Sequence, residues 1–494
     1  MSRPLTGSVA RMAAVFALTA GMTAGSLSGQ DLDGTWRGAI RIQGVALEIV
    51  VTFTTADDTL GATIIIPQQT GTTAIPLTNV RHEGTTVHFE LPSPLGQAIF
   101  DGTLDADSIA GSFVQAANQA TFDLRREGEA PDTSATPPPP YGVEEVTFPS
   151  GDLTLAGTLT IPEGPGPHPA AVMITGSGAQ NRDEELFGFK PFAIIADHLT
   201  RHGIAVLRYD DRGVGGSGGS VANSTTEDFA DDVLAAVRLL RSRPDIASDH
   251  IGVIGHSEGG VVAPLAVVRD PGIAFQVLIA PPAIPSFEIL RAQSTLIARA
   301  EGAGDEAIAR QDTTLRQVRE TLHSDTGWDT LRALVARQVR AGIEALPAER
   351  RSTITNVDSL VDAQVEAQLS QIRTPWFRAF IEYDPAPVLR QARAPLLALF
   401  GELDLQVPAT LNRDAMERIL SGSHHPDYTI KVFPHANHLF LTATTGSPSE
   451  YASLEKTFVP GFLDLITTWI TKHVRPATPS GESRDAAGGF RPRL

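Results

Sequence analysis

The chain has 494 residues, which is too long for one ordinary domain and predicts two domains with terminal tails. Its 42% hydrophobic residues can form cores, and its composition is not that of a disordered chain. The formal net charge of −18 argues against a nucleic-acid partner, because phosphate backbones are bound by an excess of Lys and Arg. Cys is absent, which excludes disulfides, zinc–thiolate sites and a thiol nucleophile.

Residues 1–29 have the pattern of a secretory signal peptide. Arg3 and Arg11 are their only charged residues, an apolar run covers residues 12–18, and small residues follow as far as Ser28. The apolar run is shorter than the roughly 20 residues that a membrane-spanning helix needs. We therefore expect export to a periplasm or out of the cell, with no stable membrane span after cleavage. An uncleaved anchor is the alternative.

Residues 31–126 alternate apolar and polar side chains with a period of two, as in Leu47, Ile49, Val51 and Phe53. Turn-forming residues recur at short intervals between these segments. This pattern predicts a small all-β barrel or sandwich of seven or eight antiparallel strands. Gly34-Thr35-Trp36 resembles the opening of lipocalin-like barrels. The domain is expected either to bind an apolar ligand or to act as a spacer or lid.

A Pro-rich linker is predicted at residues 127–142, followed by a second domain at residues 143–475. In that domain short apolar runs alternate with helical patterns, which indicates an α/β fold with a parallel sheet covered on both faces. The alternation is interrupted at about residues 285–385, where a helical pattern without strands predicts a helical cap. Residues 476–494 are expected to be a disordered tail.

A nucleophile elbow is predicted at Gly255-His256-Ser257-Glu258-Gly259, between a buried strand and an apolar helix. The tight turn admits only small residues two positions before and after Ser257. It also places the Ser257 hydroxyl at a helix N-terminus, where backbone N–H groups favour developing negative charge. Ser257 is therefore the candidate nucleophile.

A serine nucleophile needs a base and an acid that orients the base, and both are expected later in the chain. Asp404 follows the strand at residues 394–400 and is the candidate acid, with Glu402 as its rival in the same turn. His438 lies in the loop after the next strand and is the candidate base, with His435 as its rival.

The tetrahedral intermediate of acyl transfer needs two N–H donors. One is expected from Glu258, the residue after the nucleophile. The other is expected from the Gly-rich loop that follows the strand at residues 170–174, where the amides of Ser177 and Gly178 are both candidates.

Other polar motifs have simpler interpretations. His198 and His202 have the spacing of a metal pair, but no third ligand is evident, and His424 and His425 lie in a polar turn. The segment at residues 209–217 lacks the Lys of a phosphate-binding loop and is expected to be a charge-paired turn near the active site. No metal or cofactor is predicted.

Five motifs of the second domain follow one another along the chain: GSGAQNRDE, RYDDRGVGGSGG, GHSEGG, GELDLQVP and HANHLF. In this order they resemble the motifs of the α/β-hydrolase family. The resemblance is to bacterial serine esterases and peptidases of the serine aminopeptidase or acylglycerol-lipase-like group, and it covers about residues 143–475. It implies an eight-stranded, mostly parallel sheet, a lid between strands six and seven, and a triad of Ser257, Asp404 and His438. The oxyanion loop departs from the HGGG form of many lipases, and the elbow lacks the tryptophan of proline iminopeptidases.

The function expected from the sequence is hydrolysis of a small-molecule carboxylic ester by a secreted serine hydrolase without a cofactor. A peptidase or amidase with the same triad is the alternative, which acidic cap residues such as Glu301, Asp305 or Glu306 would support by binding a substrate amine. A third hypothesis is a binding protein with an inactive hydrolase domain. The sequence does not indicate the acyl group, the leaving group or the oligomeric state.

Overall fold

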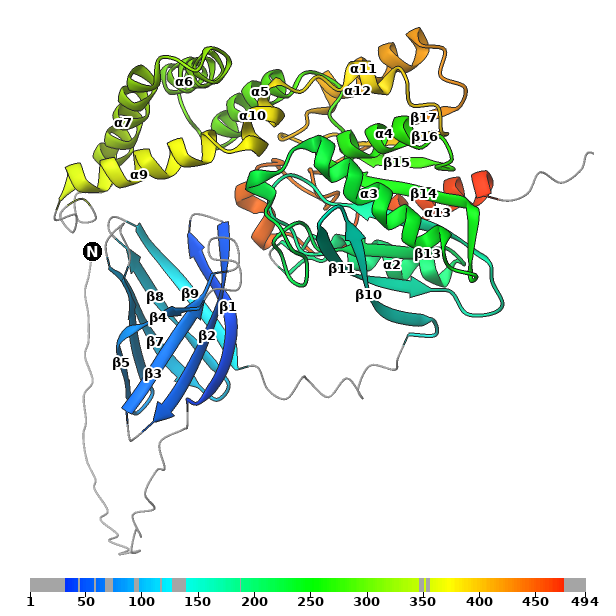
Figure 1. Ribbon diagram of the computed structural model, residues 1–494. Helices are drawn as coiled ribbons and strands as arrows, with labels where there is room; N and C mark the ends of the chain where they lie inside the picture. Colours follow the sequence, from blue (N-terminus) through cyan, green and yellow to red (C-terminus); the bar gives the residue numbers. More distant parts are fainter. Residues whose placement is uncertain are drawn as a thin grey trace, which may run out of the picture.

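The computed structural model describes residues 32–474, apart from residues 43–44, 57–58, 67–73, 93–96, 116–117, 127–138, 187, 346–350 and 352–355. The predicted signal peptide, most of the predicted linker and the predicted tail lie outside these described residues. Figure 1 shows the two described parts, a β domain and an α/β domain.

The N-terminal part is a nearly closed antiparallel sheet of nine strands, in the order β4-β3-β2-β1-β9-β8-β7-β6-β5. The predicted small β domain is thus confirmed, but the predicted number of seven or eight strands is wrong. The strand β4 has only two residues, too few for an alternating pattern to reveal it. The strands are β1 (Gly34–Ile42), β2 (Val45–Ala56), β3 (Thr59–Ile65), β4 (Ile75–Pro76), β5 (Thr78–Glu83), β6 (Thr86–Leu91), β7 (Ala98–Asp105), β8 (Ser108–Gln115) and β9 (Asn118–Arg126).

The second part contains an eight-stranded sheet in the order β10-β11-β13-β12-β14-β15-β16-β17. All neighbours are parallel except β11, which runs antiparallel to β10 and β13. The predicted eight-stranded, mostly parallel α/β-hydrolase sheet is therefore confirmed. The strands are β10 (Gly142–Ser150), β11 (Leu153–Ile161), β12 (His168–Ile174), β13 (Ala205–Tyr209), β14 (Ile246–His256), β15 (Gln276–Ile279), β16 (Leu396–Gly401) and β17 (Tyr428–Phe433).

Helices cover both faces of this sheet (Figure 1). One face packs against α3, α4 and α12, and the other against α2 and α13. The inner strands β13, β15 and β16 are buried along their whole length, as expected when both faces of a sheet are covered, whereas the edge strands β10 and β17 are partly exposed. The bounds are α2 (Pro191–Arg201), α3 (Thr226–Arg241), α4 (Gly259–Arg269), α12 (Ala409–Gly422) and α13 (Phe462–Val474).

The chain between β15 and β16, the sixth and seventh strands of this sheet, is helical in its described residues. Apart from the short helix that precedes β16, these helices share their own apolar cluster, separate from the two clusters on the faces of the sheet. Leu389 of that short helix packs in one of the two clusters on the sheet. They correspond to the predicted cap. Their bounds are α5 (Ser286–Ala300), α6 (Asp305–Ser324), α7 (Trp328–Ala345), α9 (Val357–Ile372), α10 (Pro375–Glu382) and the short α11 (Ala386–Leu389).

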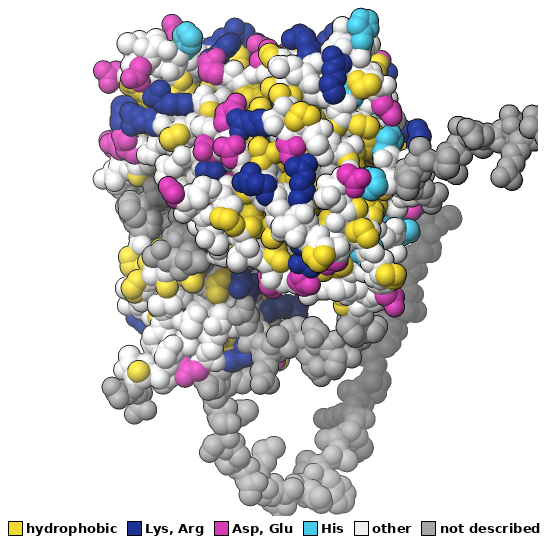
Figure 2. All heavy atoms as spheres, turned by 45° about the vertical axis from the view of Figure 1, so that its right-hand side comes forward, with side chains coloured by type: hydrophobic (Ala, Val, Ile, Leu, Met, Phe, Trp, Pro, Cys, Tyr) yellow, Lys and Arg dark blue, Asp and Glu magenta, His cyan; other side chains and the backbone are white. Residues whose placement is uncertain are grey.

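Charged side chains of both signs are interspersed on the face of the molecule in Figure 2. Exposed ion pairs such as Arg243–Glu144 and Arg269–Asp231 are frequent among the described residues. Pairs of this kind contribute little to stability individually. Within the described ranges, no helix combines the length and apolarity needed to cross a bilayer.

Candidate active site

Four loops converge at one edge of the parallel sheet, because the strands β12, β14, β16 and β17 all end there. Open α/β sheets assemble their sites at this carboxyl edge. The loops carry, in chain order, the Gly-rich segment after β12, the predicted elbow after β14, and the segments with Asp404 and His438. The candidate residues that lie far apart in the sequence are thereby brought together.

Ser257 occupies a strained turn between β14 and α4. Its φ of +52° is in the left-handed region, which a residue with a side chain rarely adopts. A Cβ atom on Gly255 would lie 2.0 Å from the Gly259 carbonyl oxygen, and one on Gly259 would lie 2.3 Å from the Ile174 carbonyl oxygen. The turn therefore requires glycine at both positions, which is the steric reason expected from the sequence.

Asp404 and His438 form a buried hydrogen-bonded pair. The His438 Nδ1–H donates to Asp404 Oδ2 over 2.8 Å, and the two residues are 5% and 3% exposed. The other carboxylate oxygen accepts the backbone N–H groups of Gln406 and Val407, each at 2.8 Å. Because Nδ1 carries the proton, Nε2 is left as an acceptor, which is the tautomer that a general base requires.

The rival residues lie outside this arrangement. Glu402 and His435 are both exposed. Glu402 Oε2 accepts the backbone N–H of His435 at 2.9 Å, so these two residues contact each other rather than Asp404 or His438. Geometry favours Asp404 and His438 over both rivals.

A cavity of about 150 Å³ opens over Ser257 and His438. Its wall combines apolar side chains, neutral amides and hydroxyls with two glutamates and two histidines, and helices α5 and α10 of the cap contribute to it. Its lining residues are Gly176, Ser177, Gln180, Glu184, Leu186, His256, Ser257, Glu258, Pro282, Ser286, Ile289, Gln293, Phe380, Gln406, Val407, His438 and Leu439.

The Gly-rich loop after β12 offers one candidate amide to this cavity. Ser177 lines it together with Ser257, whereas Gly178 lines a second cavity behind the loop. The N–H of Gly176 is already donated to Glu184 Oε1 at 2.7 Å. Among the hydrogen bonds of the described residues, none uses the N–H of Ser177 or Glu258. These two amides are available to a ligand in the cavity.

Glu258 is buried beside the nucleophile with its carboxylate facing the cap. Trp376 Nε1–H of α10 donates to both carboxylate oxygens at 3.2 Å, and Thr226 Oγ1 lies 3.5 Å from one of them. Burial raises the pKa of Glu258 to about 7, against a lowering by these two hydrogen bonds. Trp376 stacks on Phe380, which lines the cavity, so Glu258 connects the elbow to the cap.

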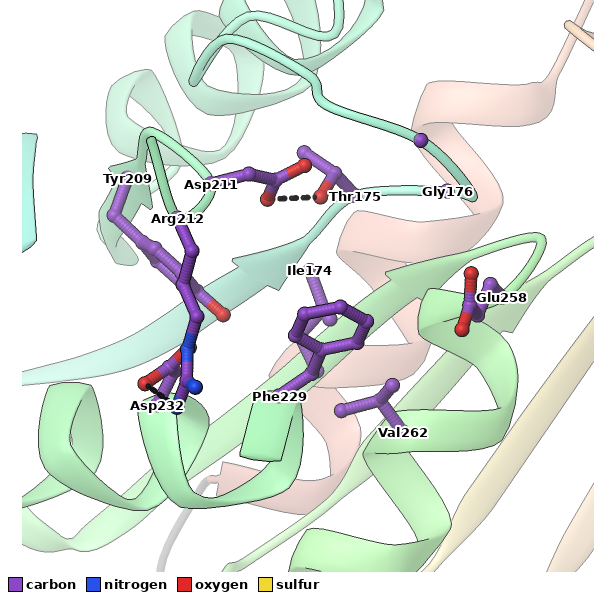
Figure 3. Close-up of a pocket in the computed structure, with 11 residues that line it drawn as sticks. Ile174, Thr175, Gly176, Tyr209, Asp211, Arg212, Phe229, Asp232, Glu258 and Val262 are labelled. Atoms are coloured by element: carbon purple, nitrogen blue, oxygen red, sulfur yellow. Dashed lines mark hydrogen bonds and ion pairs between the residues drawn. The ribbon is translucent and has the colours of Figure 1, made fainter. Parts of the chain in front are cut away.

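The second cavity, of about 20 Å³, lies behind the Gly-rich loop and has room for one water molecule (Figure 3). Asp211 forms part of its wall and holds the loop, because it accepts Thr175 Oγ1–H at 2.6 Å and the Gln180 N–H at 2.9 Å. Burial raises the pKa of Asp211 well above its usual value. The neighbouring Arg212 is paired with Asp232, so the segment at residues 209–217 is a charge-paired turn next to the site.

The remaining polar motifs lie elsewhere. The rings of His198 and His202 lie 4.4 Å apart and are tilted by 32°, and within the described residues no group of three or more His, Asp or Glu side chains could hold a metal ion. Neither His424 nor His425 lines the cavity. Asp305 and Glu306 in the cap have side chains that are 94% and 91% exposed.

Two residues of the site were not singled out from the sequence. His256 precedes the nucleophile, and Glu184 lies in the acidic run after the Gly-rich loop. Both are buried and both line the cavity. A signal was present in the sequence for His256, since a titratable residue between a buried strand and an apolar helix requires a buried partner.

Comparisons with known proteins relate the chain to hydrolases. Residues 190–303 match the family model of serine aminopeptidase, S33. The chain is 27% identical over 399 residues to Esterase EstD of Thermotoga maritima, which is 80% of this chain and 81% of that protein. A stretch of 116 residues, 24% of this chain and 29% of that protein, is 33% identical to 2,6-dihydropseudooxynicotine hydrolase of Paenarthrobacter nicotinovorans. A solved esterase structure from Pyrococcus furiosus matches 67% of this chain and 91% of its own, with 16% identity and a TM-score of 0.41.

The similarity to the Thermotoga protein is not confined to the α/β part. The aligned region spans 399 residues, or 80% of this chain, whereas only 353 residues lie between Gly142 and the C-terminus. It therefore extends into the N-terminal β domain.

Proposed function

Since this chain is a hydrolase of the α/β-hydrolase superfamily, we propose that it cleaves carboxylic esters through an acyl-enzyme on Ser257. The observation that carries the proposal is the buried hydrogen bond from His438 to Asp404 at the wall of a cavity that also contains Ser257. It supplies a base in the right tautomer next to a nucleophile on a strained turn.

In the proposed reaction, Ser257 Oγ attacks the ester carbonyl carbon while His438 Nε2 takes the hydroxyl proton. The tetrahedral intermediate then expels the alcohol, which receives that proton, and an acyl ester remains on Ser257. Water attacks this acyl group with His438 again as base, and the carboxylic acid leaves as Ser257 regains its proton. Asp404 holds the imidazole and stabilises the imidazolium. These steps require no cofactor or metal.

We assign the oxyanion donors to the backbone N–H groups of Glu258 and Ser177. Both face the cavity without an internal hydrogen bond in the described part of the chain. Gly178 is the less favoured candidate, because it lines the cavity behind the loop. Each such donor is worth roughly a hundredfold to a thousandfold in rate.

An ester substrate is favoured over a peptide by the composition of the cavity wall. An aminopeptidase needs acidic groups that hold the substrate amine, and Glu301, Asp305 and Glu306 do not line the cavity. Two other carboxylates, Glu184 and Glu258, do line it, but each already has a hydrogen-bond partner, His256 for the first and Trp376 for the second. Ser447 Oγ–H is 3.4 Å from Glu301 Oε1, which gives that carboxylate another partner. The amides of Gln180, Gln293 and Gln406 suit a neutral substrate of modest size. The match to the serine aminopeptidase model keeps peptidase or amidase activity as the second candidate.

The proposal is tested by comparing p-nitrophenyl acetate, butyrate and palmitate with aminoacyl p-nitroanilides, using Ser257→Ala as control. We expect turnover of the short esters, little cleavage of the anilides, and loss of both in the variant. Preferred anilide cleavage would support the peptidase instead. Ester turnover that persists in Ser257→Ala would overturn the assignment of the nucleophile.

We further propose that the mature protein acts in a periplasm or outside the cell, on the basis of residues 1–29. Cell fractionation followed by mass analysis of the N-terminus tests this. A mature chain that begins near Gln30 in the exported fraction is expected. A cytoplasmic protein that retains Arg3 and Arg11 would contradict it.

A further inference from the structure

His256, the residue before the proposed nucleophile, donates or accepts two buried hydrogen bonds that the mechanism above does not use. Its Nδ1 is 2.9 Å from Glu184 Oε1, and its Nε2 is 3.1 Å from the backbone carbonyl oxygen of His438. Glu184 and His256 are 5% and 6% exposed, so solvent does not substitute for these contacts. The rings of His256 and His438 lie 4.7 Å apart.

The two contacts can be made together only if the pair holds an additional proton. A neutral imidazole has one N–H and one lone pair, whereas a backbone carbonyl and an ionised carboxylate are both acceptors. The pair is therefore either an imidazolium with a carboxylate or a neutral imidazole with a carboxylic acid. Both forms have no net charge, which suits a buried site.

The surrounding groups favour the imidazolium form. Burial lowers the pKa of His256, but the Glu184 carboxylate, its hydrogen bond and the His438 carbonyl outweigh that effect and raise the pKa. Glu184 Oε1 also accepts the backbone N–H of Gly176 at 2.7 Å. Its second oxygen has no hydrogen-bond partner in the part of the chain that the structure describes.

These contacts join three loops of the site in one chain of hydrogen bonds. The chain starts at Gly176 in the loop with the oxyanion donor, passes through Glu184 to His256 on the elbow, and ends at the backbone of His438. Each loop contributes one component of the proposed reaction: the oxyanion donor, the nucleophile and the base. Their relative positions must be held to fractions of an ångström for acyl transfer.

We propose that Glu184 and His256 are positioning residues that share one proton and thereby fix the base and the oxyanion loop against Ser257. The inference rests on the proposed function of this site. The pair does not touch the reacting atoms in the mechanism above. It acts by fixing the positions of the loop of His438 and the loop of Ser177 relative to the elbow.

The test uses three substitutions that each remove one part of the hydrogen-bond chain. The amide of Gln in His256→Gln can replace Nε2–H and so retain the contact to the His438 carbonyl. The shorter amide in His256→Asn can replace only Nδ1–H and so retain the contact to Glu184. Glu184→Gln keeps an acceptor for the Gly176 N–H but cannot supply the charge that lets His256 donate through both nitrogens.

We expect kcat for p-nitrophenyl butyrate to fall about 10- to 100-fold in His256→Asn and Glu184→Gln, with KM changed less than about threefold. His256→Gln is expected to retain more activity than His256→Asn, because it preserves the contact to the catalytic loop. A merely structural role would lower the melting temperature of all three variants without this kcat-specific loss or this order. If a His256 variant does not fold, the kcat and KM of Glu184→Gln alone still test the proposal.

His425 supplies a matched control, since it is also a buried histidine but contacts Asp427 and Tyr428. His425→Asn and His425→Gln should leave kcat unchanged. Equal kcat in His256→Asn, Glu184→Gln and the wild type would overturn the positioning role. So would a loss that is equal in His256→Asn and His256→Gln.

The reaction of Ser257 with a fluorophosphonate separates the two proposals. If the wild type and Ser257→Ala are labelled alike and neither hydrolyses esters, the proposed function fails. If the wild type is labelled at Ser257 and His256→Asn is labelled at the same rate, the proposed function stands and the positioning role fails. Slower labelling of His256→Asn and Glu184→Gln is the expected result.

Discussion

The two parts of this chain bury very different side chains. In the described residues of the N-terminal β domain, every buried side chain is apolar, and the interior holds rings such as Trp36, Phe53 and Phe89 in mutual edge contacts. The α/β domain instead buries titratable groups, among them Asp404, His438, Glu184, His256 and Glu258. These titratable groups gather at the carboxyl edge of its sheet.

The difference indicates which part of the molecule carries the chemistry. Burying a charge lowers stability unless it is paired, so a cluster of buried charged groups is retained where it does something other than hold the fold. The β domain has an interior filled by its own rings, including Phe100 and Phe122. This filling argues against the hypothesis that the inside of the barrel is the site of an apolar ligand.

The strongest test of the charged region is Asp404→Asn. An amide in place of the carboxylate favours the wrong imidazole tautomer, so we expect kcat for p-nitrophenyl butyrate to fall about 10⁴-fold, which is about 5.5 kcal/mol. Glu402→Gln, in the same turn but exposed, is the matched control and should change kcat less than twofold. The opposite order of the two losses would identify Glu402 as the acid.

The apolar region is tested by Phe89→Ala. Phe89 is fully buried and contacts Phe53, Phe100 and Phe122, so its truncation should lower the free energy of unfolding of the β domain by about 3–5 kcal/mol. Thr86→Ala, at an exposed position of the same strand, is the control. Stability is measured by urea unfolding and activity on p-nitrophenyl butyrate. A loss of kcat at temperatures where the variant is folded would show that the β domain contributes to the site.

The sequence predicted the α/β architecture because period-two and period-3.6 patterns report on buried faces, and motif order reports on which loops follow which strands. The elbow is the clearest case. Gly255 and Gly259 are required by contacts within a few residues of Ser257, so a local pattern contains the information. The choice of Asp404 over Glu402 follows from its later position in the turn after β16, and the burial of Asp404 against the exposure of Glu402 now supports it.

The features that sequence patterns could not supply depend on contacts between distant segments. Glu184 and His256 are 72 positions apart, and no periodicity relates them. The choice between Ser177 and Gly178 depends on which cavity each residue lines, and the loop that carries both is held by Asp211 from another segment. The strand β4 forms only because it pairs with β3. In each case a long-range contact decides the local structure.

A smaller effect is expected from Glu258→Gln, which removes one charge that is costly to bury. The native pKa of about 7 lies above the usual 4.5, so between these values the folded protein binds a proton that the unfolded chain does not. The free energy of unfolding of the wild type should therefore fall by about 2–3 kcal/mol from pH 5 to pH 8 through this group. Urea unfolding at both pH values should show a correspondingly smaller fall in Glu258→Gln. Equal falls in the two proteins would contradict burial as the cause of the raised pKa.

The smallest effect is expected from charges that the α/β domain leaves in solvent. Asp305 and Glu306 are almost fully exposed and do not line the cavity, so the double variant Asp305→Ala, Glu306→Ala should change kcat/KM less than about twofold for both esters and aminoacyl anilides. The measurement is the ratio of kcat/KM for leucine p-nitroanilide and p-nitrophenyl butyrate, with Ser257→Ala as the blank. A selective loss of anilide cleavage would mean that the cap brings these carboxylates to the substrate amine. In that case the distinction between buried, functional charge and exposed, inert charge would fail for the cap.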